Sequence, residues 1–226
     1  MQNFYNRKEL LVLENPEDVI FTRRCHGAEN TMSTYQRKGI STLALTVSAV
    51  ISGMLYPSGA VAEIKPLTPQ TSMPINGEYY VSMGANDPRT VSEEIKSNAN
   101  LSLYGNIADD NAEGAVNNKT FIIGSTFTYG GSSGNDKLIL LYAGYSKGSG
   151  AVTGNTLNFS GSIDPEHKPD DFFLYGGYSI FNSANKNSVT ISRGELLVDD
   201  DMIVYGGWSN YGSANENEVT ISGGEL

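Results

Sequence analysis

Residues 174–194 read LYGGYSIFNSANKNSVTISRG, and residues 204–224 read VYGGWSNYGSANENEVTISGG. The two segments align without a gap, and two weaker copies precede them, beginning at Leu103 and Leu141. Self-similarity at a fixed period is typical of a solenoid or a propeller, in which neighbouring repeats bury each other's apolar side chains. The spacing between copies contracts from 38 to 33 to 30 residues, counted between the tyrosines that open them: Tyr104, Tyr142, Tyr175 and Tyr205.

The internal pattern of each copy favours a solenoid over a propeller. Residues 188–192 (SVTIS) alternate polar and apolar side chains, as a half-buried strand does. A propeller blade needs about 40–45 residues and four strands, whereas these copies are shorter and supply two or three short strands. We therefore predict an all-β fold, a right-handed parallel β-helix (β-solenoid) built from 30–38-residue repeats over residues 101–226.

The residues that recur are expected to stack from coil to coil. One aromatic column would consist of the four tyrosines that open the copies, and a second would follow three residues later, at Ile107, Tyr145, Tyr178 and Trp208. An asparagine just before the alternating strand could turn its amide inward and bond the coils on either side. These asparagines are Asn118, Asn155, Asn187 and Asn217.

Composition and charge exclude two classes of partner. The chain has 25 glycines, 13 tyrosines and only 18% charged residues, which suits short strands joined by tight turns. Its formal net charge is −10. Binding to nucleic acid or to anionic lipid needs clustered Lys and Arg, so neither partner is expected.

An apolar, uncharged run, ISTLALTVSAVISGML, occupies residues 40–55 and follows Arg37 and Lys38. A basic start, an apolar middle and a small-x-small end describe a secretory signal peptide. Ala60 and Ala62 would be the small residues, with cleavage before Glu63. The alternative is a membrane anchor, but a span needs about 20 apolar residues and this run is shorter.

These features divide the chain into four parts. Met32 begins a leader of normal length, so residues 1–31 are interpreted as a non-native extension and 32–62 as the signal peptide. An extended signal region is the alternative reading of residues 1–31. Residues 63–100 are expected to form a linker and an N-terminal cap, with 101–226 as the solenoid; within the cap, Val91–Lys96 could be a helical turn or irregular.

The Tyr-Gly-Gly-aromatic-Ser unit, followed by Ala-x-x-Asn-x-Val-Thr-Ile-Ser-Gly-Gly in residues 205–224, resembles the passenger domains of autotransporters. These are self-secreting surface proteins of Gram-negative bacteria. The resemblance implies a β-helical passenger, often adhesive, followed by a C-terminal translocating barrel. Because the chain ends at Leu226 in mid-repeat, we expect an N-terminal fragment of a longer protein. It would be exported through the inner membrane, and displayed at the outer membrane only if the parent carries the barrel; otherwise it would be periplasmic or extracellular.

Metal binding and cofactors are not expected. Residues 130–138 (GGSSGNDKL) are similar to a calcium-binding nonapeptide repeat, but the glycine spacing is one residue too long and no second copy lies nearby. Asp170-Asp171 and Asp199-Asp200-Asp201 offer oxygen ligands, yet such runs are usually solvated loops that discourage edge pairing. We predict no metal site.

The sequence also offers no recognisable set of catalytic residues. After the predicted leader the sequence contains one histidine, His167, no cysteine and no Gly-Asp-Ser-Gly stretch that would mark a serine nucleophile. The chain is therefore predicted to be a non-catalytic, adhesin-like surface protein. Its expected contact residues are Tyr178, Trp208 and Tyr211, with the loops 180–187 and 210–217, and its partner would be a host-surface protein or glycan. The alternatives are a structural stalk without binding activity and a β-helical polysaccharide-degrading enzyme.

Overall fold

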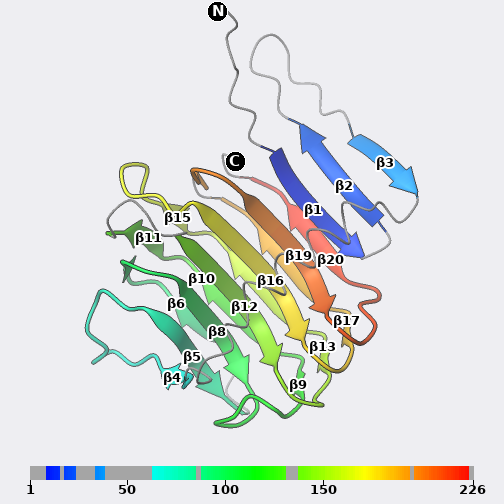
Figure 1. Ribbon diagram of the computed structural model, residues 1–226, viewed down its shortest axis with the longest axis horizontal. Coiled ribbons are helices and arrows are strands. Elements are labelled where there is room, and N and C mark those ends of the chain that lie inside the picture. Colours follow the sequence, from blue (N-terminus) through cyan, green and yellow to red (C-terminus); the bar gives the residue numbers. More distant parts are fainter. Residues whose placement is uncertain are drawn as a thin grey trace, which may run out of the picture.

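The computed structural model describes residues 63–84, 88–130, 137–193 and 196–223, together with the backbone of three strands nearer the N-terminus. Every regular element in this described part is a β-strand, and no helix is present. Figure 1 shows the strands stacked side by side in successive layers, with a long sheet in front and shorter strands behind it. The all-β prediction is confirmed.

The long sheet has nine strands in the order β3-β2-β1-β19-β16-β12-β8-β5-β4. Its central strands pair in parallel, and only β1–β2 and β2–β3 are antiparallel. The strands are β1 (Glu9–Asn15), β2 (Asp18–Arg23), β3 (Thr34–Lys38), β4 (Lys65–Pro66), β5 (Gly77–Met83), β8 (Leu101–Ile107), β12 (Leu138–Ser146), β16 (Asp171–Ser179) and β19 (Met202–Ser209).

Three smaller parallel sheets close the other sides. The five-stranded sheet contains β6 (Arg89–Val91), β10 (Thr120–Ile123), β14 (Thr156–Phe159), β18 (Ser188–Ile191) and β20 (Glu218–Ile221). One three-stranded sheet contains β7 (Ile95–Ser97), β11 (Thr126–Tyr129) and β15 (Ser162–Ile163). The other contains β9 (Val116–Asn117), β13 (Val152–Thr153) and β17 (Ala184–Asn185).

The chain winds through these sheets once per repeat, which makes a β-solenoid. In one full coil it runs along β12, turns a corner into β13, and continues through β14 and β15 before β16 begins the next coil. Tyr142 pairs in register with Tyr104 on one side and Tyr175 on the other, and Tyr175 pairs with Tyr205. The repeat read from the sequence is therefore one coil of the solenoid.

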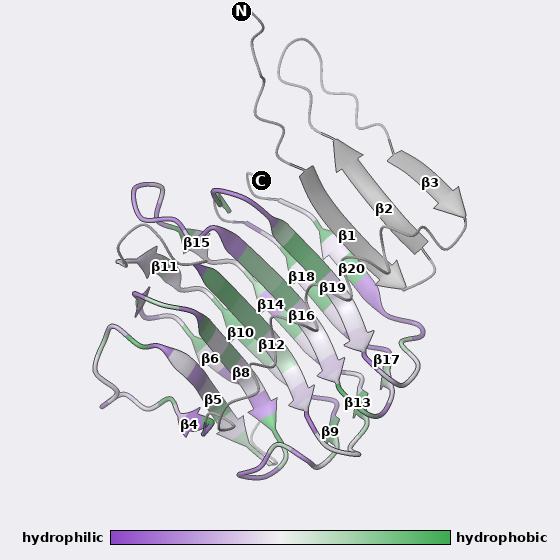
Figure 2. Ribbon diagram, in the orientation of Figure 1, coloured by the Kyte–Doolittle hydropathy of each residue, from purple (hydrophilic) through white to green (hydrophobic). Residues whose placement is uncertain are grey.

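Apolar side chains from the long sheet, from the five-stranded sheet and from the sheet of β7, β11 and β15 fill the interior. Val189 and Ile191 of β18 pack with Leu157 and Phe159 of β14 and with Leu174 of the long sheet, and all five are fully or almost fully buried. Figure 2 shows the hydrophobic residues concentrated in the strands and the hydrophilic ones in the connecting loops. Burial of this apolar surface is the main source of stability, because each coil has too little apolar surface to fold alone.

The four tyrosines that open the copies belong to a second buried cluster, on the opposite face of the long sheet. Along β12, Ile139 and Leu141 belong to the interior, whereas Leu140 and Tyr142 belong to this outer cluster. The tyrosine rings stack from coil to coil, with centroids 5.0, 4.7 and 4.9 Å apart along the series Tyr104, Tyr142, Tyr175 and Tyr205. The predicted aromatic column is confirmed.

Three of the four predicted asparagines form a buried amide ladder. Asn155 donates its backbone N–H and its side-chain Nδ2 to Oδ1 of Asn187, at 2.9 and 3.0 Å. Asn187 repeats both bonds to Asn217, at 2.8 and 3.3 Å. A glycine opposite each amide makes the room: a Cβ on Gly144 would lie 2.8 Å from Cγ of Asn155. The glycine of the Tyr-x-Gly pattern is therefore needed to leave space for the asparagine side chain of the amide ladder.

The prediction for Asn118 is wrong. Thr120 pairs with Thr156, so Lys119 occupies the place of Asn155, and Asn118 falls on a corner with φ of 54°. Asparagine tolerates this left-handed conformation better than most residues do. In this coil the buried amide comes instead from Asn106, which replaces the glycine and donates Nδ2 to the carbonyl of Ala143 at 3.0 Å.

The N-terminal end of the solenoid is covered by residues 63–76. Lys65–Pro66 (β4) pairs with β5, Ile64 packs into the outer tyrosine cluster, and Ile75 is 1% exposed in the interior. The following residues, where a helical turn or an irregular cap was expected, form β5, β6 and β7 and make a regular coil. Ala60, Ala62 and the apolar run of the predicted leader lie outside the described residues, and Glu63 is exposed.

Candidate functional site

The last two coils present a matched pair of corner loops. Residues 180–183 join β16 to β17, and residues 210–213 occupy the same place after β19. The segments 179–185 (SIFNSAN) and 209–215 (SNYGSAN) contain no charged residue. Other loops among the described residues carry acidic clusters, such as Asp109-Asp110 and Asp199-Asp200.

Backbone hydrogen bonds hold the two loops to each other and to the coil before them. Ile180 donates its N–H to the carbonyl of Ser146 at 3.0 Å, and Tyr211 donates to the carbonyl of Ile180 at 3.1 Å. The hydroxyl of Ser209 donates to the carbonyl of Asn182 at 2.6 Å and accepts from the N–H of Gly212 at 2.7 Å. The corner is therefore fixed in shape before any partner arrives, which lowers the entropic cost of binding.

Two aromatic rings project from this corner into solvent. Phe181 is 61% exposed and Tyr211 is 76% exposed, and their rings stack with centroids 5.4 Å apart and planes 7° from parallel. Counting on from the Ser146–Ser179 pair, the matching residue of the preceding coil is Gly148, which has no side chain. The stack thus ends at Phe181, and the pair stands as a small apolar platform.

Asn210 places a hydrogen-bonding group beside the platform. Its Oδ1 accepts from the indole Nε1 of Trp208 at 2.8 Å and from the hydroxyl of Tyr178 at 3.1 Å. Because both donors bind the same oxygen, the carboxamide is held in one orientation and its Nδ2 group is directed away from them. Asn210 directly precedes Tyr211 in the chain, so this fixed amide belongs to the same loop as the exposed ring.

The three predicted contact residues play different roles. Tyr211 is on the surface as expected, and Trp208 is half-buried with its ring 4.9 Å from that of Tyr205. Tyr178 is only 2% exposed, so its ring cannot meet a partner, and its hydroxyl instead positions Asn210. Phe181 lies within the predicted contact loop 180–187 but was not named as a contact residue, although alignment of the two C-terminal copies places it opposite Tyr211.

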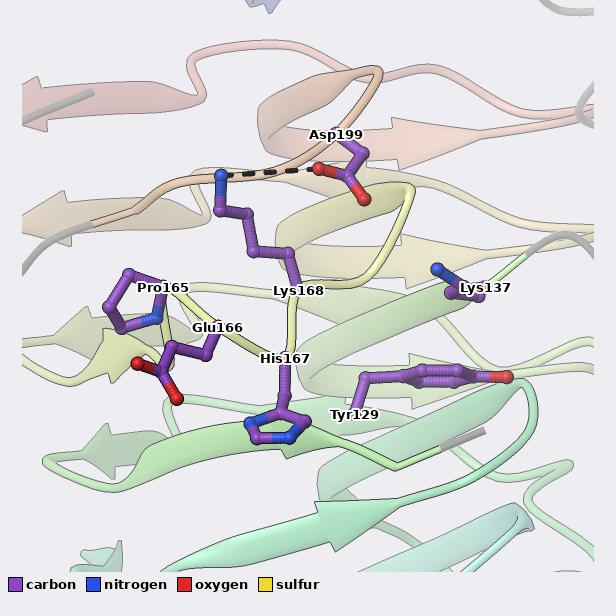
Figure 3. Close-up of a pocket in the computed structure, with 7 residues that line it drawn as sticks. All are labelled: Tyr129, Lys137, Pro165, Glu166, His167, Lys168 and Asp199. Atoms are coloured by element: carbon purple, nitrogen blue, oxygen red, sulfur yellow. Dashed lines mark ion pairs between the residues drawn. The ribbon is translucent and has the colours of Figure 1, made fainter. Parts of the chain in front are cut away.

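A separate hollow of about 230 Å³ lies where two loops meet near the far end of the strands (Figure 3). Three of its side chains have an acidic neighbour: His167 Nδ1 lies 3.2 Å from Asp164 Oδ2, Lys168 Nζ 4.0 Å from Asp199 Oδ1, and Lys137 Nζ 3.6 Å from Asp170 Oδ1. Among the described residues, no serine or cysteine lines this hollow. The lining residues are Tyr129, Lys137, Pro165, Glu166, His167, Lys168 and Asp199.

The acidic segments do not gather into a cation site within the described residues, where no group of three or more acidic, histidine or cysteine side chains could hold a metal. Burial raises the pKa of Asp171 to about 6, and the nearby charges of Asp201, Asp200 and Asp170 add to the shift, against a hydrogen bond from the backbone of Asp201. Residues 131–136, the centre of the calcium-like segment, lie outside the described residues.

The chain matches no protein-family profile, no curated protein and no solved structure. Among the described residues, no helix has the length and apolar character needed to cross a membrane. The class that the structure defines is therefore a β-solenoid with a rigid, uncharged aromatic corner.

Proposed function

We propose that this protein is an exported, non-catalytic, adhesin-like surface protein whose corner of Asn210, Tyr211 and Phe181 contacts a partner on a host cell. One observation carries the proposal: two stacked rings are exposed on loops that hydrogen bonds already hold in place. Large exposed rings on a fixed backbone supply contact area at low conformational cost. The resemblance of the repeat to autotransporter passengers supports the same function.

Export is the second part of the proposal. It rests on the apolar run at residues 40–55 and on the small residues Ala60 and Ala62. Cleavage before Glu63 would remove β1 to β3 and leave β19 as an edge strand of the long sheet. Such an edge can pair with a further strand, so the exported chain would depend on a neighbour or a cover there.

The test is adhesion of the purified protein to cultured animal cells. Tyr211→Ala removes the more exposed ring, and we expect it to reduce binding by about tenfold, as loss of a central aromatic contact does. Met73→Ala is the matched control, since Met73 is also exposed but lies far along the chain in the N-terminal segment. Equal loss in both variants, or no binding by the unaltered protein, would contradict the proposal.

A structural stalk is the second candidate. It is favoured by the fact that the recurring tyrosines and asparagines are satisfied by contacts between coils. A stalk would show no adhesion in the assay above while keeping its fold. The adhesion result therefore separates the two functions.

A further inference from the structure

Resting on the proposed function, we propose that the corner formed by Phe181, Asn210 and Tyr211 binds an uncharged hexopyranose unit of a surface glycan. The juxtaposition of an exposed ring stack with an oriented amide donor carries this proposal. The chemistry of the recognised group can be worked out from three features of the corner: its rings, its amide and its lack of charge.

The rings provide a flat apolar surface of the size of a sugar ring. A pyranose has one face on which several C–H groups point the same way, and this face packs flat against an aromatic ring. The electron-rich face of an aromatic ring attracts such partly positive hydrogens. The rings of Tyr211 and Phe181 are nearly parallel, and both are mostly exposed, so the pair offers ring surface to such packing. Gly148 leaves the side of Phe181 that faces the preceding coil without a competing side chain.

The amide supplies the directional contact. A sugar that covers Tyr211 brings its hydroxyl oxygens to the rim of the ring, where Nδ2 of Asn210 can donate to one of them. The orientation of Asn210 is already set by Trp208 and Tyr178, so no rotamer has to be frozen on binding. Aromatic stacking combined with a fixed hydrogen bond is specific for a polar molecule that has one apolar face.

The charge of the corner and of the chain determines which sugars the corner can bind. Segments 179–185 and 209–215 contain no lysine or arginine, and the whole chain has a formal net charge of −10. Of the lysines that border the corner, Lys186 is paired with Glu216 at 3.6 Å, and Lys147 lies in the preceding coil beside Ile180. Acidic sugars would therefore be repelled at long range by the net negative charge of the chain. The corner fits a neutral sugar.

The small size of the corner favours a sugar over a folded protein. A stable protein interface buries about 800 Å² on each partner and has an apolar centre of many residues. The two rings and their amide rim form a much smaller contact, which suits one or two sugar units. Weak single sites of this kind gain strength when several copies bind one surface together.

The chain contains a single tryptophan, and it lies at the site. Titration of the full chain with lactose, cellobiose and maltose, followed by Trp208 fluorescence, should give saturable curves for at least one disaccharide. Sialyllactose should bind about tenfold more weakly than the best neutral sugar, because the net negative charge of the chain repels its carboxylate. Saturation by none of the three neutral sugars, or preference for the acidic one, overturns the proposal.

Variants separate a binding role from a structural one. Tyr211→Phe keeps the ring and should bind as the unaltered chain does, whereas Tyr211→Ala should lose about tenfold in affinity. Tyr178→Phe keeps the buried ring but frees Asn210 from one of its two donors, and should weaken binding a few-fold through loss of orientation. Met73→Ala should change nothing. Equal affinity for Tyr211→Ala and Tyr211→Phe would refute the assignment.

Adhesion to cells stripped of their glycans distinguishes this inference from the function on which it rests. Loss of adhesion after glycosidase treatment supports both. Adhesion that survives the treatment leaves the contact function standing and refutes the glycan. Absence of adhesion to untreated cells, with sugar binding in solution, refutes the adhesive function while the sugar site stands.

Discussion

Replacement of Asn187 by alanine tests the amide ladder where it is most fully bonded. Asn187 is 1% exposed, and its Oδ1 accepts the backbone N–H and the Nδ2 of Asn155. Its own Nδ2 donates to the carbonyl of Val152 at 2.9 Å. The alanine variant leaves the N–H of Asn155 and the carbonyl of Val152 without these partners in the interior. At about 1–3 kcal/mol for each unsatisfied buried group, the expected loss in unfolding free energy is about 4 kcal/mol.

Asn217→Ala is the matched control at the end of the same ladder. Asn217 is 8% exposed, and within the described residues its Nδ2 has no hydrogen-bond partner. It serves one neighbour, Asn187, so its removal should cost about 1–2 kcal/mol. Urea unfolding followed by circular dichroism measures both losses, provided that the transitions are two-state. Equal losses for the two variants, or no loss for Asn187→Ala, would refute the reasoning.

Two further predictions concern charge and export. The pKa of Asp171 is raised to about 6 from an ordinary value of 3.8, so folding favours its protonated form. The contribution of Asp171 to stability should therefore be greatest below about pH 4 and be lost as the pH rises through 6. The full shift in pKa corresponds to about 3 kcal/mol of unfolding free energy. Because Asp171 is only partly buried, we expect Asp171→Asn to raise the unfolding free energy by only about 1 kcal/mol at pH 7, and not at pH 4. Thermal unfolding across pH checks this, and an equal gain at both pH values would rule it out. The exported protein should begin at Glu63 by N-terminal sequencing, and peptides from residues 1–31 in the precursor would contradict the assignment of Met32 as the start.

The sequence repeat predicted the coil because each recurring residue contacts the equivalent residue of the next coil. Tyr142 and Tyr175, or Asn155 and Asn187, lie one coil apart, so their alignment in the sequence is also their contact in space. The coil that begins at Leu101 was harder to align, since Asn117, Asn118 and Lys119 lie consecutively. Only the strand pairing shows which of them faces Asn155.

The prediction for Tyr178 failed for a different physical reason. Simple alternation would place Tyr175 and Tyr178, three residues apart, on opposite faces of the strand. The pairing of β16 with its neighbours omits Gly176, and Tyr175 and Tyr178 both lie in the outer cluster. The register is unchanged across this position, so all the paired strands depart from simple alternation together. The sequence marks the place only by its paired glycines, Gly176 and Gly177.

The corner could be located from the sequence but its chemistry could not. Variation between copies pointed to residues 180–187 and 210–217, and Tyr211 was among the predicted contacts. The role of Asn210 depends on two donors that reach it from different coils, Tyr178 and Trp208. No spacing rule connects these three residues, so only the folded chain shows the site.

The central claim is that recurring residues build the coils while the exposed corner makes the contact. The most direct test is the cell-binding curve of Tyr211→Ala, recorded on protein whose unfolding midpoint has been measured. The ring of Tyr211 is mostly in solvent, so we expect an unfolding midpoint close to that of the unaltered chain and binding reduced by about tenfold. Unchanged binding by a folded Tyr211→Ala variant would contradict the claim.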